Sequence, residues 1–205
     1  MTEPHAPGLH AAILAAGPST RFGSPKQLVR VSGAPVLHNA IATAAAVAGQ
    51  SVTVVLGANA GEIAPALRQQ SASIVVNRNW TEGIASSIRA AVHAAPPGCE
   101  GLLLLPADRI AVTVDDLRRL HAAWRRHPVL LVAALHGGAP DLPAIFPPWT
   151  FADLLELRGD HDPRVVIRRN VDRMVRVPMA NAAIDLDTPE DLLQIEAAEP
   201  TRPEG

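Results

Sequence analysis

A short loop with two basic side chains carries the clearest chemistry in this sequence. It extends from Gly17 to Lys26 and directly follows an apolar run of strand length, His10 to Leu14. The small residues of the loop let backbone N–H groups approach an anion, and Arg21 and Lys26 add positive charge on a segment that we expect to be exposed. Because ligands of open α/β sheets bind at the carboxyl ends of strands, the pattern predicts a polyphosphate site here.

The distribution of charged residues favours a phosphate ligand for this loop. No acidic residue occurs between Glu3 and Glu62, although the chain has 20 aspartates and glutamates. Lys26 is the only lysine among the 18 lysines and arginines, which indicates that a compact ammonium is needed at this position. The spacing fits neither a P-loop nor a G-x-G-x-x-G dinucleotide loop, and an ordinary basic surface turn is the alternative.

A second candidate for ligand binding is the start of a helix near Gly83. The first turn of a helix has unpaired backbone N–H groups, and Ser86 or Ser87 would add a hydroxyl beside them. The segment begins at Asn77 and contains Trp80. The alternative is a plain capped helix with Trp80 packed in the core.

Three aspartates are placed to hold a cation. Asp108 follows the buried run Gly101 to Leu105, and a lone carboxylate at such a strand end suits Mg²⁺, which combines carboxylate with phosphate oxygens. Asp185 and Asp187 lie two residues apart at the end of a predicted strand, Ala182 to Leu186, so their side chains would point to the same face. We expect Asp187 to be the second Mg²⁺ ligand beside Asp108, with Asp185 in support, at the sheet edge where the basic loop lies.

The elements that would carry these residues alternate along the chain. Strand-length apolar runs are separated by segments with helical period, which is typical of an α/β fold on a mostly parallel, mixed sheet. With 205 residues, of which 48% are hydrophobic, we expect one three-layer, Rossmann-like domain over residues 1–205, with an ordered core of about 9–196 and frayed Pro- and Glu-rich ends. The predicted strands are 10–14, 51–56, 73–76, 101–105, 129–134, 144–146, 174–177 and 182–186. The predicted helices are 35–48, 61–70, 83–95, 113–127, 150–157, 164–170 and one that follows Thr188.

These segments resemble nucleotidyltransferases with a GT-A-like fold, especially the molybdenum-cofactor cytidylyltransferase branch. The first match, Leu14 to Lys26, is similar to the motif L-A-A-G-x-S-x-R-F/M-G-x-x-K, and the segments 77–87 and 184–191 are similar to N-x-x-aromatic-x-x-G-x-x-x-S and I/L-D-I-D-T-P-E-D. The resemblance extends from about Ala11 to Ile195 and implies that the loop wraps a triphosphate. The nucleotide-binding residues that it implies are Leu14, Ala15, Ala16, Gly17, Ser19, Arg21, Lys26, Gly83, Ser86 and Ser87.

The resemblance implies transfer of a cytidylyl group from CTP to a phosphorylated acceptor, with release of pyrophosphate. The implied acceptor is a pterin, molybdopterin loaded with molybdenum, and the implied cofactor is Mg²⁺, held by Asp108 and Asp187. Arg21, Lys26 and Asp108 would be the catalytic residues, and the series Ala15-Ala16-Gly17 resembles the cytidine rather than the guanosine branch. The alternatives are a guanylyl or sugar-phosphate nucleotidyltransferase of the same fold, and a non-catalytic nucleotide-binding partner in the maturation of a molybdenum hydroxylase.

Three segments depart from the family pattern on the acceptor side. Arg109 stands where the family has Gln-Pro or Met-Pro after the aspartate, and Asp141-Leu142-Pro143 replaces G-H-P. In the segment that resembles L-x-G-D-x-G-A-R, Asp162-Pro163 replaces Gly-Ala. Asp160 and Arg164 of that segment are the candidate acceptor-binding residues, although Asp162-Pro163 fits a plain helix start equally well.

Composition argues against several other functions. A net charge of -2 and 3% aromatic residues are untypical of nucleic-acid binding. Cys99 is the only cysteine, so the chain cannot form an intramolecular disulfide or a cysteine-based zinc site. The apolar stretch Ala11 to Ala16 is too short for a signal sequence or a membrane span, and we expect a cytoplasmic protein.

Overall fold

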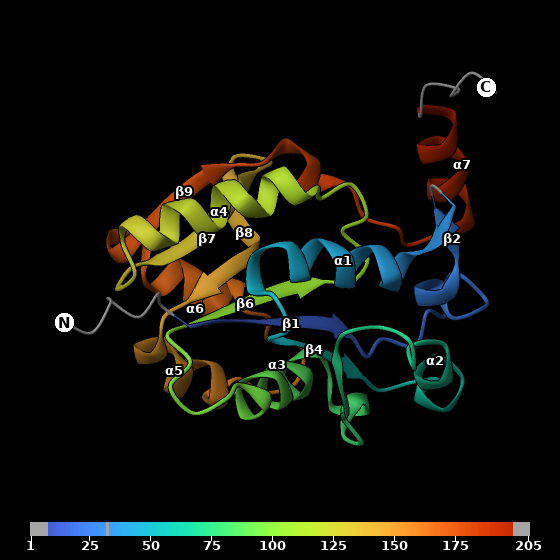
Figure 1. Cartoon of the computed structure of the whole chain (residues 1–205), viewed down its shortest axis with the longest axis horizontal. Helices are drawn as coiled ribbons and strands as arrows, with labels where there is room; N and C mark the ends of the chain where they lie inside the picture. The colour runs from blue at the N-terminus through green and yellow to red at the C-terminus, as the bar shows by residue number, and fades with distance from the viewer. Residues whose placement is uncertain (1–7, 32, 199–205) are drawn as a thin grey trace.

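A mixed seven-stranded sheet forms the centre of the computed structural model, which describes residues 8–31 and 33–198 (Figure 1). Its strands are β1 (Leu9–Ala15), β4 (Val52–Leu56), β5 (Ser73–Val76), β6 (Gly101–Pro106), β7 (Leu131–His136), β8 (Ala139–Phe146) and β9 (Met174–Pro178). Their order across the sheet is β5-β4-β1-β6-β8-β7-β9, and only β8 runs antiparallel to its neighbours. The α/β class and the mostly parallel, mixed sheet are confirmed.

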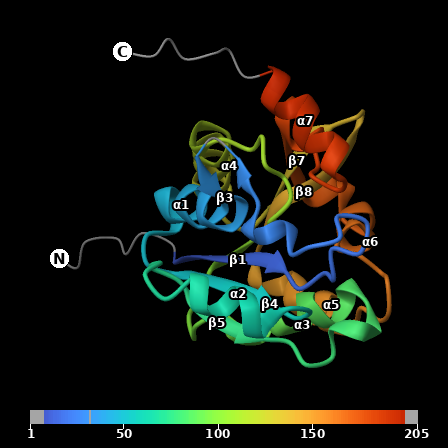
Figure 2. The same ribbon diagram turned by 90° about the vertical axis from the view of Figure 1, so that its right-hand side faces the viewer.

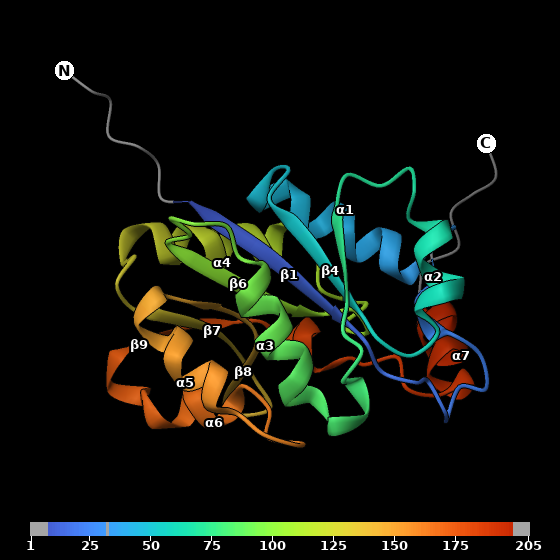
Figure 3. The ribbon, with the colours of Figure 1, turned by 90° about the horizontal axis from the view of Figure 1, so that it is seen from below.

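Helices cover both faces of this sheet, which gives the predicted three layers. The α-helices of the described residues are α1 (Val36–Ala48), α2 (Ala60–Ala66), α3 (Ile84–Ala94), α4 (Val114–Arg126), α5 (Phe151–Glu156), α6 (Arg164–Arg169) and α7 (Pro189–Ala198), of which α7 projects away from the sheet (Figure 1). α1 and α4 pack on one face through Leu37 and Trp124, whereas α3, α5 and α6 pack on the other through Ile88, Leu154 and Ile167. Figure 3 shows the second group in front of the sheet. Among the residues that the structure describes, no helix is both long and apolar enough to cross a membrane.

The central strands are buried on both faces, which explains their uninterrupted apolar sequences. In β1, Ala11 and Ile13 belong to the core on the side of α1 and α4, and Ala12 belongs to the core on the side of α3. β6 begins with Gly101 because Trp124 packs directly over it. A Cβ atom at this glycine would lie 2.5 Å from Trp124 Cζ2, so no larger residue fits without displacing α4.

The strand register brings the loops after β1 and β6 together. Leu14 of β1 is level with Val55 of β4 and with Pro106 of β6. Figure 2 shows β1 running across the middle of the molecule, with its arrowhead pointing to the right. Because the three strands end at the same level, the basic loop after β1 and Asp108 after β6 are neighbours.

The predicted strand Ala182–Leu186 is wrong. Ala180–Ala183 forms a 3-10 helix, and the following residues have no regular structure. The backbone of this segment bonds to a loop instead of to a neighbouring strand, since Leu186 N–H donates to Asp108 O at 3.0 Å. Ile184 is exposed, so the apolar alternation that suggested a strand does not mark a buried face.

A tight hairpin joins β7 and β8 and makes β8 longer than predicted. His136 pairs with Ala139, which leaves Gly137 and Gly138 as a two-residue turn. Both glycines have positive φ, at 56° and 79°, as the turns favoured between antiparallel strands require. Only residues 144–146 of β8 were predicted, because the glycine pair was not used as a hairpin signal.

The start of α4 allows a prediction about stability. The Asp116 carboxylate accepts hydrogen bonds from the backbone and the hydroxyl of Thr113, and Thr113 Oγ1 accepts one from Asp116 N–H. Burial raises the pKa of Asp116, but these bonds and one from Arg119 outweigh it and hold the pKa below its ordinary 3.8. We expect Asp116→Asn to lower the free energy of unfolding by about 1–2 kcal/mol at neutral pH, as for a lost helix cap.

Urea unfolding at several pH values checks this expectation. A carboxyl whose pKa is lower in the folded state stabilises the fold above the unfolded-state pKa, and loses that effect as pH falls through the folded-state value. The difference between wild type and Asp116→Asn should therefore shrink below about pH 4. Asp115→Asn is the control, because this neighbouring side chain is 84% exposed. Equal stability of wild type and Asp116→Asn at pH 7 would contradict the capping role.

Candidate active site

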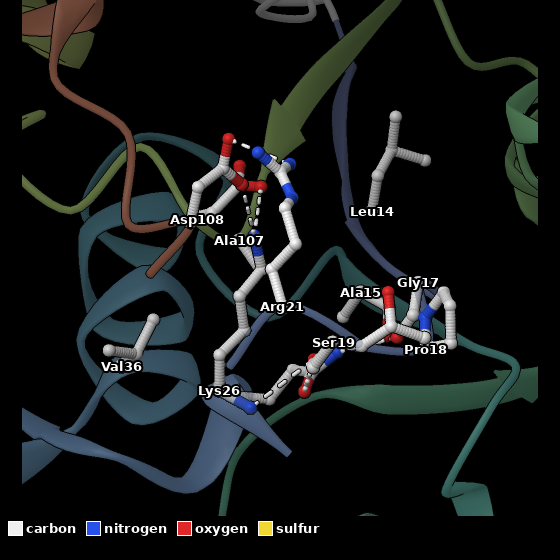
Figure 4. A pocket seen from close by; sticks show the side chains of 13 residues that line it. Leu14, Ala15, Gly17, Pro18, Ser19, Arg21, Lys26, Val36, Ala107 and Asp108 are labelled. Carbon is white, nitrogen blue, oxygen red and sulfur yellow. Dashed lines mark hydrogen bonds and ion pairs between the residues drawn. The ribbon is translucent and has the colours of Figure 1, made fainter. Parts of the chain in front are cut away.

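A cavity of about 270 Å³ opens where β1 and β6 end (Figure 4). The loop after β1 forms one side of it, and the residues after β6 and before α7 form the other. The structure thus brings the basic loop and both predicted metal ligands to one place. The predicted residues in the lining are Leu14, Ala15, Gly17, Ser19, Arg21, Lys26, Asp108 and Asp187.

Gln27, which the sequence analysis did not single out, fixes the shape of the loop. Its buried side chain donates hydrogen bonds to Ala15 O at 3.1 Å and to Gly17 O at 3.2 Å. Ser19 has a left-handed backbone conformation, and its hydroxyl donates to Gln27 Oε1 and accepts from Lys26 N–H. The Ser19 hydroxyl therefore helps to hold the loop closed around the cavity. The only sign of this role in the sequence is that a glutamine directly follows Lys26.

Lys26 does not lie on an exposed surface, contrary to the expectation from the sequence. Its side chain is only 16% exposed, and Nζ lies 2.9 Å from Asp108 Oδ2, 3.0 Å from Asp187 Oδ1 and 2.8 Å from Leu186 O. Burial alone would lower the pKa of Lys26, but the two carboxylates outweigh it and raise the pKa. Lys26 therefore stays an ammonium ion and neutralises two carboxylates that would otherwise repel each other.

Both carboxylate oxygens of Asp187 and its backbone N–H have partners within the protein. Oδ1 accepts a hydrogen bond from Lys26, and Oδ2 lies 3.0 Å from the guanidinium of Arg21, which is 68% exposed. Burial raises the pKa of Asp187, but Lys26 and Arg21 outweigh it and lower the pKa, so this group is a carboxylate near neutral pH. Its backbone N–H donates to Asp191 of α7. The first turn of α7 therefore positions the side chain of Asp187.

Asp185 lines the same neighbouring cavity as Asp108 and Asp187, although the segment that carries it is not a strand. Its Oδ1 lies 2.9 Å from Nη1 of Arg109, a side chain that is only 14% exposed. Burial raises the pKa of Asp185 to about 6, an effect that Arg109 partly offsets and the charges of Asp108 and Asp187 reinforce. Asp185 is thus paired with Arg109, and its supporting role at the Mg²⁺ position stays a prediction.

The three departures from the family pattern meet at Asp141. Its Oδ2 lies 3.5 Å from Arg109 Nη2 and 4.0 Å from Arg164 Nη1, and Arg164 Nε donates to Asp162 at 2.7 Å. These side chains line a second cavity of about 280 Å³, which also reaches Asp108. The replacements are therefore parts of one charged network, and that network forms a wall next to the first cavity.

A third cavity, of about 360 Å³, lies on the other side of the loop, against the start of α3. Ala16, Gly83 and Asp160 are in its lining. Gly83 has φ of 117°, and a Cβ atom here would lie 2.4 Å from Gly159 O and 2.5 Å from Asp160 Oδ1. Asp160 therefore lies with the predicted nucleotide residues, whereas Arg164 lines the second cavity, and the two cavities share Ile84, Pro106 and Asp108.

The two predicted serines of α3 differ in their surroundings. Asn77 donates to Ser86 Oγ at 2.7 Å and to Ser87 Oγ at 3.0 Å, so both hydroxyls are held by one buried amide. Ser87 lines the third cavity, whereas the Ser86 hydroxyl donates to Gly83 O. Trp80 lines the cavity as well and is only partly buried, so the alternative of a core tryptophan does not hold. Asn77 is a further functional candidate that anchors Ser87.

Comparison with known proteins is consistent with this geometry. A protein of Rhodopirellula baltica named "Probable molybdenum cofactor guanylyltransferase" is 33% identical over 135 residues, which are 64% of this chain and 64% of that protein. The molybdenum cofactor cytidylyltransferase of Escherichia coli K12 is 24% identical over 182 residues, which are 88% of this chain and 92% of the relative. The matched part thus covers less than two thirds of the first relative.

A solved structure has the same fold. The Rv0371c homologue from Mycobacterium sp. strain JC1 is 25% identical, with a TM-score of 0.79 over 93% of this chain and 98% of its own. The sequence profile of the MobA-like NTP transferase domain matches residues 11–174, which include the basic loop, the start of α3 and Asp108. From a match of this extent, the chain belongs to the MobA-like NTP transferase family.

Proposed function

We propose that the protein transfers the cytidylyl group of CTP to a phosphorylated pterin acceptor, molybdopterin loaded with molybdenum, and releases pyrophosphate. The observation that carries this proposal is the convergence of Arg21, Lys26, Asp108 and Asp187 on one cavity beside a loop of small residues. Cations and carboxylates at the end of a parallel strand are the groups that phosphoryl chemistry needs. Membership in a family of NTP transferases supports the same reaction class.

The basic residues would act on the triphosphate. The acceptor phosphate attacks the α-phosphorus of CTP in line with the leaving pyrophosphate, so negative charge builds up on the bridging and terminal oxygens. Arg21 and Lys26 line the cavity from the loop side, where they can neutralise that charge. Gln27 and Ser19 hold the loop in a fixed shape, and such pre-organised groups lower the barrier mainly by position and electrostatics.

Asp108 and Asp187 fit a magnesium ion that arrives with the triphosphate. Both are hard oxygen donors that contact the same Nζ atom, so their carboxylates lie close enough to bind one cation. In the described part of the chain no group of three or more His, Cys, Asp or Glu side chains is placed to hold a metal. Two protein ligands suit Mg²⁺, which completes its coordination with phosphate oxygens and water. When bound, it neutralises and orients the phosphate oxygens.

The third cavity is the proposed site for the base. Ala16 lies in its lining, and a methyl group at this position takes up space that a glycine would leave to a larger purine. The Asp160 carboxylate at Gly83 can accept a hydrogen bond from the amino group of cytosine, which uracil lacks. The similarity of Ala15-Ala16-Gly17 to the cytidine branch points in the same direction.

The second cavity is the proposed site for the acceptor. It adjoins Asp108 and Asp187, so a phosphate there would face the α-phosphorus held in the first cavity. Its walls combine apolar side chains, such as Leu142 and Ile84, with the charged network around Asp141. A flat heterocycle with N–H donors and a phosphorylated side chain matches both kinds of wall.

Pyrophosphate release tests the function directly. With molybdenum-loaded molybdopterin as acceptor, we expect faster release from CTP than from GTP or UTP, and loss of release with EDTA and recovery with added Mg²⁺. The cytidylylated product should appear in amounts equal to the pyrophosphate. Faster turnover of GTP would assign the chain to guanylyl transfer, and an absence of turnover with every triphosphate would support the non-catalytic alternative.

The two carboxylates should matter for turnover more than for folding. We expect Asp108→Asn and Asp187→Asn each to lower kcat by about 100-fold or more, because an amide binds Mg²⁺ and balances phosphate charge poorly. Steady-state pyrophosphate release gives kcat, and thermal unfolding reports the fold. Asp115→Asn is the control, since Asp115 is exposed on α4. An Asp108→Asn enzyme as active as wild type would rule out the assigned metal position.

Gly83→Ala should weaken nucleotide binding. The new Cβ atom would have to displace Gly159 and Asp160, and φ of 117° is unfavourable for alanine. We expect KM for CTP to rise about tenfold, because the wall of the base cavity moves. Gly61→Ala in α2 is the control, since a Cβ atom there meets no atom within 4 Å. If Gly83→Ala left KM for CTP unchanged, the base site would have to lie elsewhere.

A further inference from the structure

The ammonium group of Lys26 and a divalent cation need the same carboxylate oxygens. Nζ has three N–H donors, and the structure gives it three acceptors: Asp108 Oδ2, Asp187 Oδ1 and Leu186 O, all within 3.0 Å. Lys26 is therefore fully satisfied by the protein. It can bind a phosphate oxygen, or leave the carboxylates to a metal, only by giving up at least one of these bonds.

The position of Lys26 makes it a strong competitor for these oxygens. Its side chain is only 16% exposed, so its attraction to Asp108 and Asp187 is weakly screened by solvent. Arg21 also contacts Asp187, but from a side chain that is 68% exposed. A divalent cation that enters between the two carboxylates would meet the buried ammonium within a few ångströms, and like charges at that distance repel strongly.

A triphosphate offers Lys26 an alternative partner. Lys26 lines the same cavity as Gly17 and Ser19 of the loop, so phosphate oxygens held there would compete with the two carboxylates for Nζ. Figure 4 shows the side chain of Lys26 extending along the cavity from the loop to Asp108. When Nζ turns to a phosphate oxygen, Asp108 Oδ2 and Asp187 Oδ1 are released.

We propose that Lys26 makes cation binding conditional on the triphosphate, so that the divalent cation is bound tightly only together with the nucleotide. This inference rests on the proposed function in one respect, the assignment of Asp108 and Asp187 as metal ligands. Lys26 is then the residue that couples the two ligands, and by thermodynamic linkage each ligand raises the affinity for the other by the same factor. Without nucleotide, Lys26 also prevents the two aspartates from repelling each other.

Binding of Mn²⁺ without nucleotide tests this role of Lys26 without any turnover. Free Mn²⁺ is measured by electron paramagnetic resonance during titration of wild type, Lys26→Ala and Lys26→Gln. We expect weak binding to wild type and about tenfold tighter binding to both variants, within the range of typical coupling energies. Lys26→Gln keeps a polar side chain of similar length, so it covers the case in which Lys26→Ala fails to fold. Thermal unfolding of each variant identifies the folded samples.

Arg21→Ala is the matched control, because it also removes one positive charge at Asp187. We expect its Mn²⁺ affinity to change less than about threefold, since the exposed arginine is screened by solvent. A second series contains a non-hydrolysable CTP analogue. The analogue should raise the Mn²⁺ affinity of wild type by a larger factor than that of either Lys26 variant.

Three results would overturn the inference. The first is that Mn²⁺ binds the Lys26 variants no more tightly than wild type. The second is that Arg21→Ala raises the Mn²⁺ affinity as much as the Lys26 variants do, which would indicate a general charge effect. The third is that no protein binds Mn²⁺. If wild type nevertheless turned over CTP with Mg²⁺, the proposed function would stand and only the coupling role would fail. If no variant bound Mn²⁺ even with the analogue, the metal assignment would fail as well.

Discussion

The contact of one lysine with two aspartates determines how the candidate site is built. Lys26 is separated from Asp108 by 82 positions and from Asp187 by 161, yet one Nζ atom contacts both. The loop after β1, the end of β6 and the segment before α7 are therefore joined by a single, partly buried charge. Since opposite charges must balance in a partly buried place, none of the three segments can take its position without the other two. The site is a property of the whole domain and not of any one motif.

The acceptor side shows the same principle with different residues. Arg109, Asp141, Asp162 and Arg164 each bear a charge, and each has an opposite charge within 4.0 Å. Considered separately, Arg109, Asp141 and Asp162 look like losses of family residues, whereas Arg164 matches the family motif. In the structure they are interdependent, because a buried arginine such as Arg109 requires the carboxylates around it. A pocket can change its chemistry in this way while its charges remain balanced.

The sequence was sufficient to predict the local elements and the position of the basic loop. Continuous apolar runs identify the strands around β1 and β6 because both faces of those strands are buried, and the carboxyl-end rule places the loop at a ligand site. It was not sufficient for the segment 182–186, where apolar and polar residues alternate although the segment forms no strand and Ile184 is exposed. The sequence also did not predict the partners of Lys26. Side-chain contacts between distant loops leave no periodic signal in a sequence. The role of Gln27 went unnoticed for a related reason, because two of its three hydrogen-bond partners are backbone carbonyls, which leave no mark in the sequence.

One short peptide, residues 159–164, touches two of the three cavities. Asp160 lies against the start of α3 in the cavity next to Ala16, and four residues later Arg164 lies in the cavity with Asp141. Under the proposed assignment of the cavities, this one peptide would contact both the nucleotide and the acceptor. A substitution in these six residues would then change both specificities at once, so the two would be inherited as a pair rather than independently.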